Sequence, residues 1–122
     1  ENHFIFLGSI YNKDYLDTLR QHSVMYFHGH SVGGTNPSLL EAMAAGSRII
    51  AHNNEFNKAI LGLEGLYFSE IEDLSQIIKN GQELLPKLDK FKLLNIEKIE
   101  THYKWESIAK DYENCFLKVI SK

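Results

Sequence analysis

The sequence predicts an α/β fold: a Rossmann-like parallel sheet with helices on both faces, followed by a helical C-terminal segment. Short apolar runs alternate with stretches of helical spacing up to residue 68, and the connections between the runs are too long for hairpins. From residue 70 onward only helical spacing remains. Strands that alternate with helices form right-handed βαβ units, which build a parallel sheet covered on both sides.

The first elements are predicted by short apolar runs and one helix cap. The runs Phe4–Leu7 and Val24–Phe27 are too short for helices, and their aromatic and β-branched residues are typical of buried strands. Asn12 is a suitable N-cap for a helix between them. Residues 28–36 hold three glycines and no periodicity, so we expect a loop there.

The second half begins with a helix that opens at Pro37 or Ser38 and stops at Gly46. Two further strands are expected, at residues 48–51 and 65–68, with a short helix at 57–61 between them. The last helix has the clearest periodicity, with apolar residues at i, i+3, i+4 and i+7 from Trp105 onward. Its aromatic residues are predicted to form part of the core or an interdomain face, and Cys115 to be a packing residue.

The composition limits the classes of function. Of the 122 residues, 43% are hydrophobic and 24% are charged, which excludes a disordered tail, a collagen-like repeat and a disulfide miniprotein. The net charge of −3 without a basic cluster argues against nucleic acid as a partner. The single cysteine favours a reducing compartment, and no apolar run approaches the ~20 residues of a membrane span. We therefore expect a cytoplasmic location.

Residues 21–47 carry the signal for a binding site. This segment holds one formally charged residue, Glu41, and four of the eight glycines. A strand, a glycine-rich loop and a helix N-terminus together form an anion site, because free backbone N–H groups and the positive end of the helix dipole point at the loop. Gly33 and Gly34 allow a ligand to approach the backbone, and Pro37 has no N–H to leave unpaired. Phosphate fits such a site.

A structural interpretation of the same residues stays open. The two glycines can form a turn, and Ser38 with Glu41 can form a capping box in which Glu41 accepts from the backbone N–H of Ser38. His28 and His30 face one side of an extended chain, but residues 24–39 contain no Asp, Glu or Cys, so we predict no metal site. One of the two, taken as His30, is assigned to donate to a ligand phosphate.

The run from His28 to Gly46, followed by Arg48–Ala51, resembles the donor-binding signature of retaining GT-B glycosyltransferases of family four. More narrowly, it is similar to the bacterial rhamnosyltransferase-like group. The resemblance continues through residues 54–58, 61–62 and 66–68 to 103–109 and so covers nearly the whole chain.

The resemblance implies the C-terminal half of a GT-B enzyme, which binds a nucleotide-sugar donor and needs no further cofactor. The diphosphate would meet the loop and the helix N-terminus, and Glu41 would accept hydrogen bonds from the ribose hydroxyls. The donor-binding residues implied are His30, Gly33, Gly34, Thr35, Asn36, Pro37, Ser38 and Glu41. The favoured donor is dTDP-rhamnose, transferred to a glycan or lipid-linked acceptor in polysaccharide biosynthesis.

One position departs from the family pattern. The family usually carries two glutamates eight residues apart, and the first of them contacts the transferred sugar. Here the position eight residues before Glu41 is Gly33, so contacts to the sugar fall to backbone groups, Thr35 or Asn36. No catalytic residue is assigned. The stretch 1–122 is expected to be a partial donor domain, inactive alone, without its upstream strands, an Arg/Lys pair and the acceptor domain. The complete enzyme would associate peripherally with the inner face of the membrane. The alternative is a non-catalytic Rossmann-like interaction module.

Overall fold

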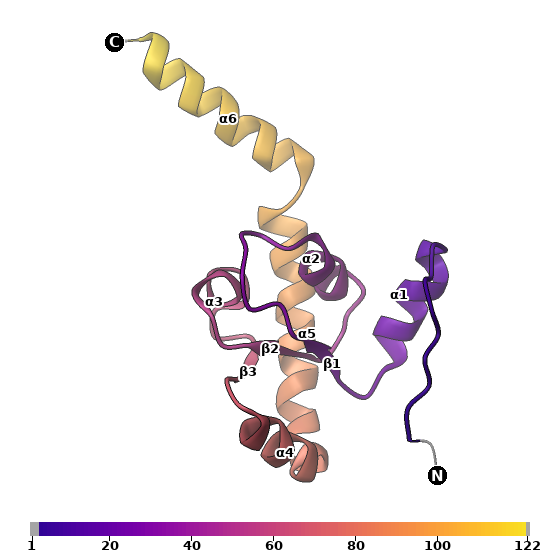
Figure 1. The fold of residues 1–122 in the computed structure, drawn as a ribbon. Helices are drawn as coiled ribbons and strands as arrows, with labels where there is room; N and C mark the ends of the chain where they lie inside the picture. The colour runs from indigo at the N-terminus through magenta and orange to yellow at the C-terminus, as the bar shows by residue number, and fades with distance from the viewer. Residues whose placement is uncertain (1–2, 122) are drawn as a thin grey trace.

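A three-stranded parallel sheet and six helices make up the fold of residues 3–121, which the computed structural model describes (Figure 1). The elements follow in the order α1 (Lys13–His22), β1 (Tyr26–His28), α2 (Pro37–Ala44), β2 (Ile49–His52), α3 (Glu55–Leu61), β3 (Leu66–Phe68), α4 (Ile71–Lys79), α5 (Gly81–His102) and α6 (Trp105–Ile120). The predicted α/β class and the parallel sheet are confirmed.

The strands lie in the order β1-β2-β3, so each neighbour in space is also the next strand in the chain. The pairs in register are Tyr26 with Ile49, Phe27 with Ile50, His28 with Ala51, Ile50 with Leu66, Ala51 with Tyr67 and His52 with Phe68. Because all three strands run the same way, their carboxyl ends meet at one edge of the sheet. This edge carries the glycine-rich loop.

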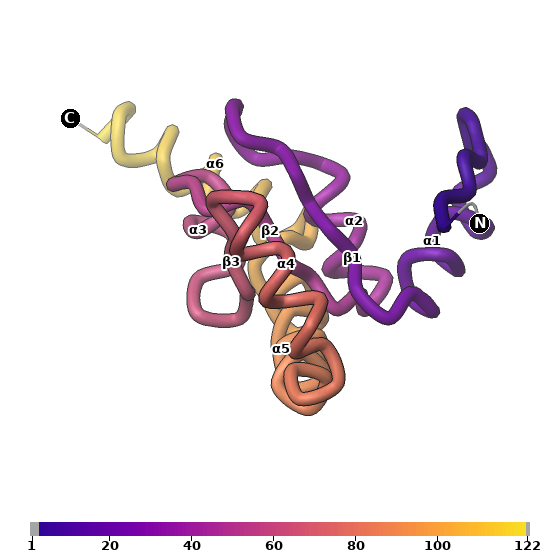
Figure 2. The backbone as a smooth tube through the Cα atoms, turned by 60° about the horizontal axis from the view of Figure 1, so that its bottom comes forward, coloured from indigo at the N-terminus to yellow at the C-terminus, as the bar shows by residue number. Residues whose placement is uncertain are grey.

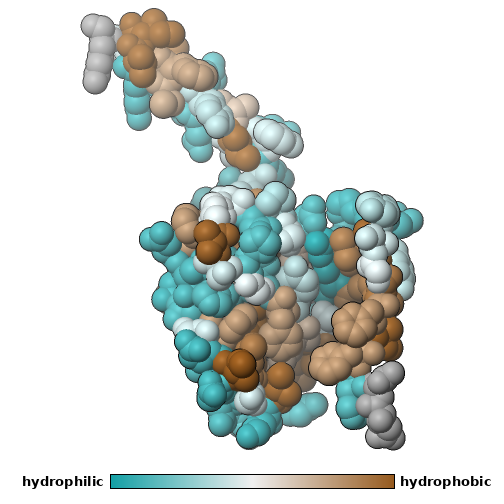
Figure 3. Space-filling view, viewed as in Figure 1, coloured by the Kyte–Doolittle hydropathy of each residue, from teal (hydrophilic) through white to brown (hydrophobic). Residues whose placement is uncertain are grey.

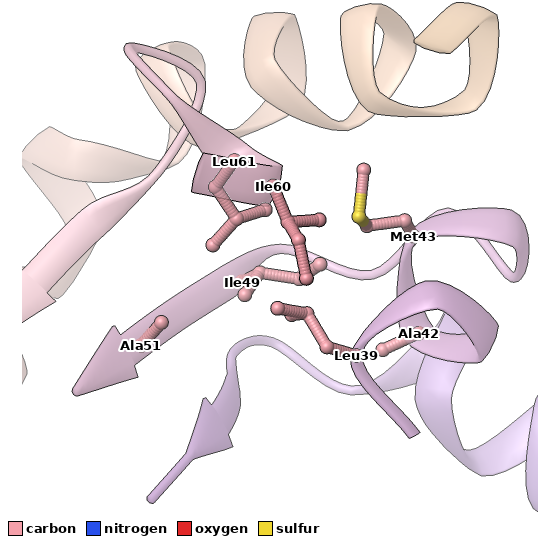
Figure 4. Packing of buried hydrophobic residues seen from close by; sticks show 7 residues of the cluster. All are labelled: Leu39, Ala42, Met43, Ile49, Ala51, Ile60 and Leu61. Atoms are coloured by element: carbon pink, nitrogen blue, oxygen red, sulfur yellow. The ribbon is translucent and has the colours of Figure 1, made fainter. Parts of the chain in front are cut away.

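The main core lies between the sheet and two of the helices. It is formed by Leu39, Ala42 and Met43 of α2, Ile49 and Ala51 of β2, and Ile60 and Leu61 of α3 (Figure 4). Ile50 lies between the two core residues of β2 and points to the opposite face, where it is also fully buried. The helix α4 lies on that opposite side, next to β3 (Figure 1), so helices lie on both sides of the sheet as predicted.

The long helix α5 contacts the helices on both sides of the sheet and so connects them. It packs against both α2 and α4. Its residue Asp89 forms an ion pair of 2.8 Å with Arg48, which fixes α5 to the start of β2. Near its C-terminal end, Lys98 donates to the carbonyl oxygens of Ile60 and Leu61 and pairs with Glu64 at 2.9 Å. These contacts satisfy carbonyl groups that the C-terminus of α3 leaves without helical partners.

The predicted strand at Phe4–Leu7 is wrong. These residues have no regular structure, and their side chains are exposed, with Phe6 at 94%. A strand needs a neighbour that accepts its backbone hydrogen bonds, and β1 pairs only with β2 in the part of the chain described. The segment lies with α1 to one side of the sheet, as Figures 1 and 2 both show.

The edge strand β1 differs from its prediction by a shift toward the carboxyl end. It covers Tyr26–His28 instead of Val24–Phe27, and Val24 is exposed. Beside this edge lies a hollow of about 460 Å³ between β1 and the junction of α4 with α5. Because β1 extends to residue 28, His28, which the sequence placed in the loop, is a buried strand residue.

The last helix makes few contacts with the rest of the chain. It extends away from the sheet after a bend at residues 103–104 (Figure 1). Its apolar side chains face solvent (Figure 3). Trp105 is 82% exposed, so of the two alternatives for these aromatic residues the core is excluded, and the interdomain face stays a prediction. The packing role predicted for Cys115 is wrong, because that residue is exposed. None of the helices in residues 3–121 is long and apolar enough to cross a membrane.

Candidate functional site

The glycine-rich loop joins the carboxyl end of β1 to the N-terminus of α2. Asn36 is the N-cap of α2: its Oδ1 accepts from the backbone N–H of Ser38 at 2.9 Å and from the Ser38 hydroxyl at 2.6 Å. Pro37 occupies the first turn, where its missing N–H costs nothing. The sequence therefore predicted the start of this helix correctly. The other N–H groups of the first turn are bonded as well, because those of Leu39 and Leu40 donate to the Asn36 carbonyl oxygen at 3.1 and 3.3 Å. The N–H groups left for a ligand are therefore those of the loop itself.

The loop exposes its backbone on one side. Gly33 has a φ of 115°, a conformation that residues with a side chain rarely adopt. A Cβ added at Gly33 or Gly34 would meet no atom within 4 Å, and Thr35 is exposed. The loop residues predicted to bind a ligand thus lie together and are exposed, with open space where Gly33 and Gly34 have no side chain.

The two histidines at the end of β1 lie in different environments. His28 is only 3% exposed and its ring stacks on that of His30 with 5.6 Å between centroids. Burial, and then the neighbouring His30, lower the pKa of His28 below its usual value, so its imidazole is neutral at pH 7. Its Nε2 has no hydrogen-bond partner among the described residues. His30 is exposed and free to meet a ligand.

Glu41 lies on the side of α2 that faces α1, where it pairs with Arg20. The distance from Arg20 Nη2 to Glu41 Oε2 is 2.9 Å, and Arg20 Nη1 also contacts Asp17 at 3.1 Å. Burial opposes the charge of Arg20, which is 6% exposed, but hydrogen bonds to Glu41 and Asp17 raise its pKa. The alternative of a capping box between Ser38 and Glu41 is wrong, because Asn36 caps the helix.

Sequence reasoning missed three polar residues that the fold brings to the same edge. His52 ends β2, and Asn54 and Asn57 begin α3. The Nδ2 atoms of Asn54 and Asn57 both donate to the carbonyl oxygen of His30, at 2.9 and 3.1 Å. A signal was available, since a polar turn directly after a predicted parallel strand lies at the ligand-binding edge. Their contact with a loop 24 residues earlier could not be read from spacing.

The arrangement suits an anion. The backbone N–H groups of residues 31–35 make no hydrogen bond within the described residues, and the exposed His30 and the N-terminus of α2 lie on either side of them in the chain. A negative ligand beside that N-terminus gains about 0.3–1 kcal/mol from the helix dipole. No group of three or more His, Cys, Asp or Glu side chains within residues 3–121 could hold a metal ion. Comparison with protein-family models, with curated proteins and with solved structures finds no match to this chain.

Proposed function

We propose that this chain is the donor-binding half of a retaining GT-B glycosyltransferase and that it binds a nucleoside diphosphate sugar. One observation carries the proposal: the loop between His28 and Pro37 stands at the carboxyl end of a parallel sheet with its glycine backbone exposed beside a capped helix N-terminus. The same residues bear the resemblance to the donor-binding signature of that family. The geometry and the motif thus support the same ligand.

The diphosphate is the group that this loop would hold. Transfer of the sugar leaves a growing negative charge on the diphosphate oxygens, and fixed N–H dipoles stabilise that charge without reorganising. His30 would add a hydrogen bond from its exposed ring. The loop's neutrality helps, since no carboxylate between residues 24 and 39 repels the phosphates. The chain thereby lowers the barrier by binding the leaving group.

Glu41 would bind the ribose. Its Oε2 is held by Arg20 at 2.9 Å, which fixes the carboxylate against α1 and leaves Oε1 to accept hydrogen bonds from hydroxyl groups. Its side chain is 45% exposed, so a ligand can reach it. The ion pair with Arg20 is compatible with ribose binding, and it fixes the orientation of the carboxylate that the ribose would meet.

The finer assignments follow from the resemblance. The sugar would contact Thr35, Asn36 and the backbone near Gly33, where the family's first glutamate is replaced. The favoured donor is dTDP-rhamnose, and a glycan or lipid-linked acceptor would be bound by a separate acceptor domain. The enzyme would act in the cytoplasm, associated with the inner face of the membrane.

Titration of the ¹⁵N-labelled chain with dTDP, followed by NMR, tests this proposal. We expect the amide signals of Gly33, Gly34 and Ser38 to shift in a saturable way, because the phosphates bind there. Thymidine without phosphates is the control and should leave these signals in place. If millimolar dTDP and UDP shift none of them, the donor site is refuted and an interaction module, favoured by the exposed apolar side of α6, takes its place.

A further inference from the structure

Two side-chain amides at the start of α3 converge on a single carbonyl oxygen of the glycine loop. Asn54 Nδ2 and Asn57 Nδ2 lie 2.9 and 3.1 Å from the oxygen of His30. A carbonyl oxygen has two lone pairs, so these donors use its full capacity. Neither contact is local, since 24 and 27 residues separate the partners.

Asn57 also links the loop to the sheet. Its amide donates a second hydrogen bond, of 2.9 Å, to the carbonyl oxygen of His52 at the end of β2. The pairing of β1 with β2 ends with His28 opposite Ala51. Asn57 therefore connects the segments that follow these two strands, just beyond their last paired residues. Asn57 is 3% exposed, and a buried amide with both N–H groups bonded is strongly held in place.

The rest of the loop has little else to fix it. Residues 31–35 take part in no hydrogen bond within the described part of the chain, and the next anchor is the Asn36 cap of α2. Hydrogen bonds therefore hold the loop only at its two ends, as far as the described residues show. One is the helix cap and the other is the carbonyl of His30.

We propose that Asn54 and Asn57 are positioning residues that hold the His30 carbonyl and thereby set the loop in its ligand-binding conformation before a phosphorylated ligand arrives. A loop that is already ordered does not lose conformational freedom on binding, which raises affinity without a new contact. The effect on ligand affinity rests on the proposed function. The effect on loop order does not.

Asn54→Asp separates this role from the helix cap. The Asn54 Oδ1 accepts from the N–H of Asn57 at 2.8 Å, and an aspartate oxygen keeps this cap bond. The aspartate has no N–H to donate, so a carboxylate would face the His30 carbonyl and repel it. Asn12→Asp is the matched control, because Asn12 caps α1 through Oδ1 in the same way and lies far from the loop in the sequence.

The experiment measures backbone ¹⁵N order parameters of residues 29–36 in the 122-residue chain without ligand, and then its affinity for dTDP. In the wild type and in Asn12→Asp, the amides of Gly29, His30 and Ser31 should be near the rigid value of about 0.85. In Asn54→Asp they should fall toward about 0.6 or lower. Affinity for dTDP should weaken roughly three- to tenfold, as expected for a lost hydrogen bond.

The outcomes distinguish the two proposals. Unchanged order parameters in Asn54→Asp, or a loop that is already mobile in the wild type, would overturn the positioning role. Lower order parameters without any dTDP binding, even by the wild type, would keep the positioning role and refute the donor site. If the loop loosens while dTDP binds as tightly as to the wild type, loop order does not control affinity and the proposal fails.

Discussion

At the scale of single residues, His28 is buried, and its Nε2 has no hydrogen-bond partner within residues 3–121. Burial lowers its pKa below the usual 6.5 in the folded chain, and the neighbouring His30 adds to this. The unfolded chain keeps the ordinary pKa, so between the lowered value and about 6.5 the unfolded state binds more protons. Stability therefore rises with pH across this window. It is fully present above about pH 6.5 and declines below it.

We predict that the free energy of unfolding of the wild type falls as the pH is lowered from 7 to 5, and that His28→Phe removes part of this fall. Phenylalanine keeps a ring for stacking on His30 and cannot be protonated. Urea denaturation at pH 5, 6 and 7 measures the slope. His22→Gln removes an exposed histidine and is the control that should keep the wild-type slope. An equal slope in His28→Phe would contradict the prediction.

Glu41 has two roles that can be separated by variants. Glu41→Ala removes both the proposed ribose contact and the partner of Arg20, so we expect lower stability and a dTDP affinity weakened roughly ten- to hundredfold. Asp17→Asn disturbs the other partner of Arg20 and should lower stability without changing the affinity. Calorimetry of dTDP binding and thermal unfolding give both readouts. Unchanged affinity in Glu41→Ala would leave Glu41 with the ion pair alone.

At the scale of elements, Gly46 terminates α2 because it adopts a left-handed conformation. Its φ is 72°, and a Cβ there would meet Ile96 Cδ1 of α5 at 3.3 Å. We predict that Gly46→Ala lowers the free energy of unfolding by about 1–3 kcal/mol. Gly34→Ala is the matched control: it has open space and no positive φ, so urea denaturation should show a change within about 0.5 kcal/mol. Similar losses in both variants would contradict this reason.

The helix α6 is expected to be dispensable for the stability of the sheet layers. Its apolar residues Trp105, Tyr112 and Phe116 are all more than half exposed, and such a surface promotes association. We predict that the chain self-associates as its concentration rises, and that a variant ending at Lys104 stays monomeric with stability within about 0.5 kcal/mol of the wild type. Sedimentation and urea denaturation test both parts. A large loss of stability would show that α6 packs on the sheet.

The sequence-based hypothesis that α6 serves another domain stays a prediction. The structure decides only that the surface exists, because the helix leaves the sheet at residues 103–104. Tyr103, just before that point, still packs against the core.

At the scale of the whole molecule, we predict that these 122 residues bind dTDP weakly and transfer no sugar. The loop and the helix N-terminus are open to solvent, and sugar transfer requires an acceptor hydroxyl held in line with the donor. Incubation with a radiolabelled nucleotide-sugar and a glycan acceptor measures transfer, and hydrolysis of the donor is followed as the control reaction. Transfer of label would show that the reacting centre is complete within this chain.

Local rules were enough to place the start of α1 after Asn12, the start of α2 at Pro37 or Ser38, the end of α2 at Gly46 and the glycine loop between β1 and α2. Capping residues, proline and glycine act on the backbone within a few residues of their own position, so the residues that mark a helix end lie next to it in the sequence. The parallel sheet also followed from the alternation of elements alone.

Contacts between distant segments were decided only by the tertiary structure. Spacing could not show that Arg20 holds Glu41, or that Asn57 ties the loop to the end of β2, because these pairs lie in different elements. The same limit explains the wrong strand at Phe4–Leu7, and why the sequence left open whether the aromatic residues of α6 lie in the core or on an exposed face. An apolar pattern indicates that a segment has an apolar face. Only the positions of the neighbouring elements determine whether that face is buried.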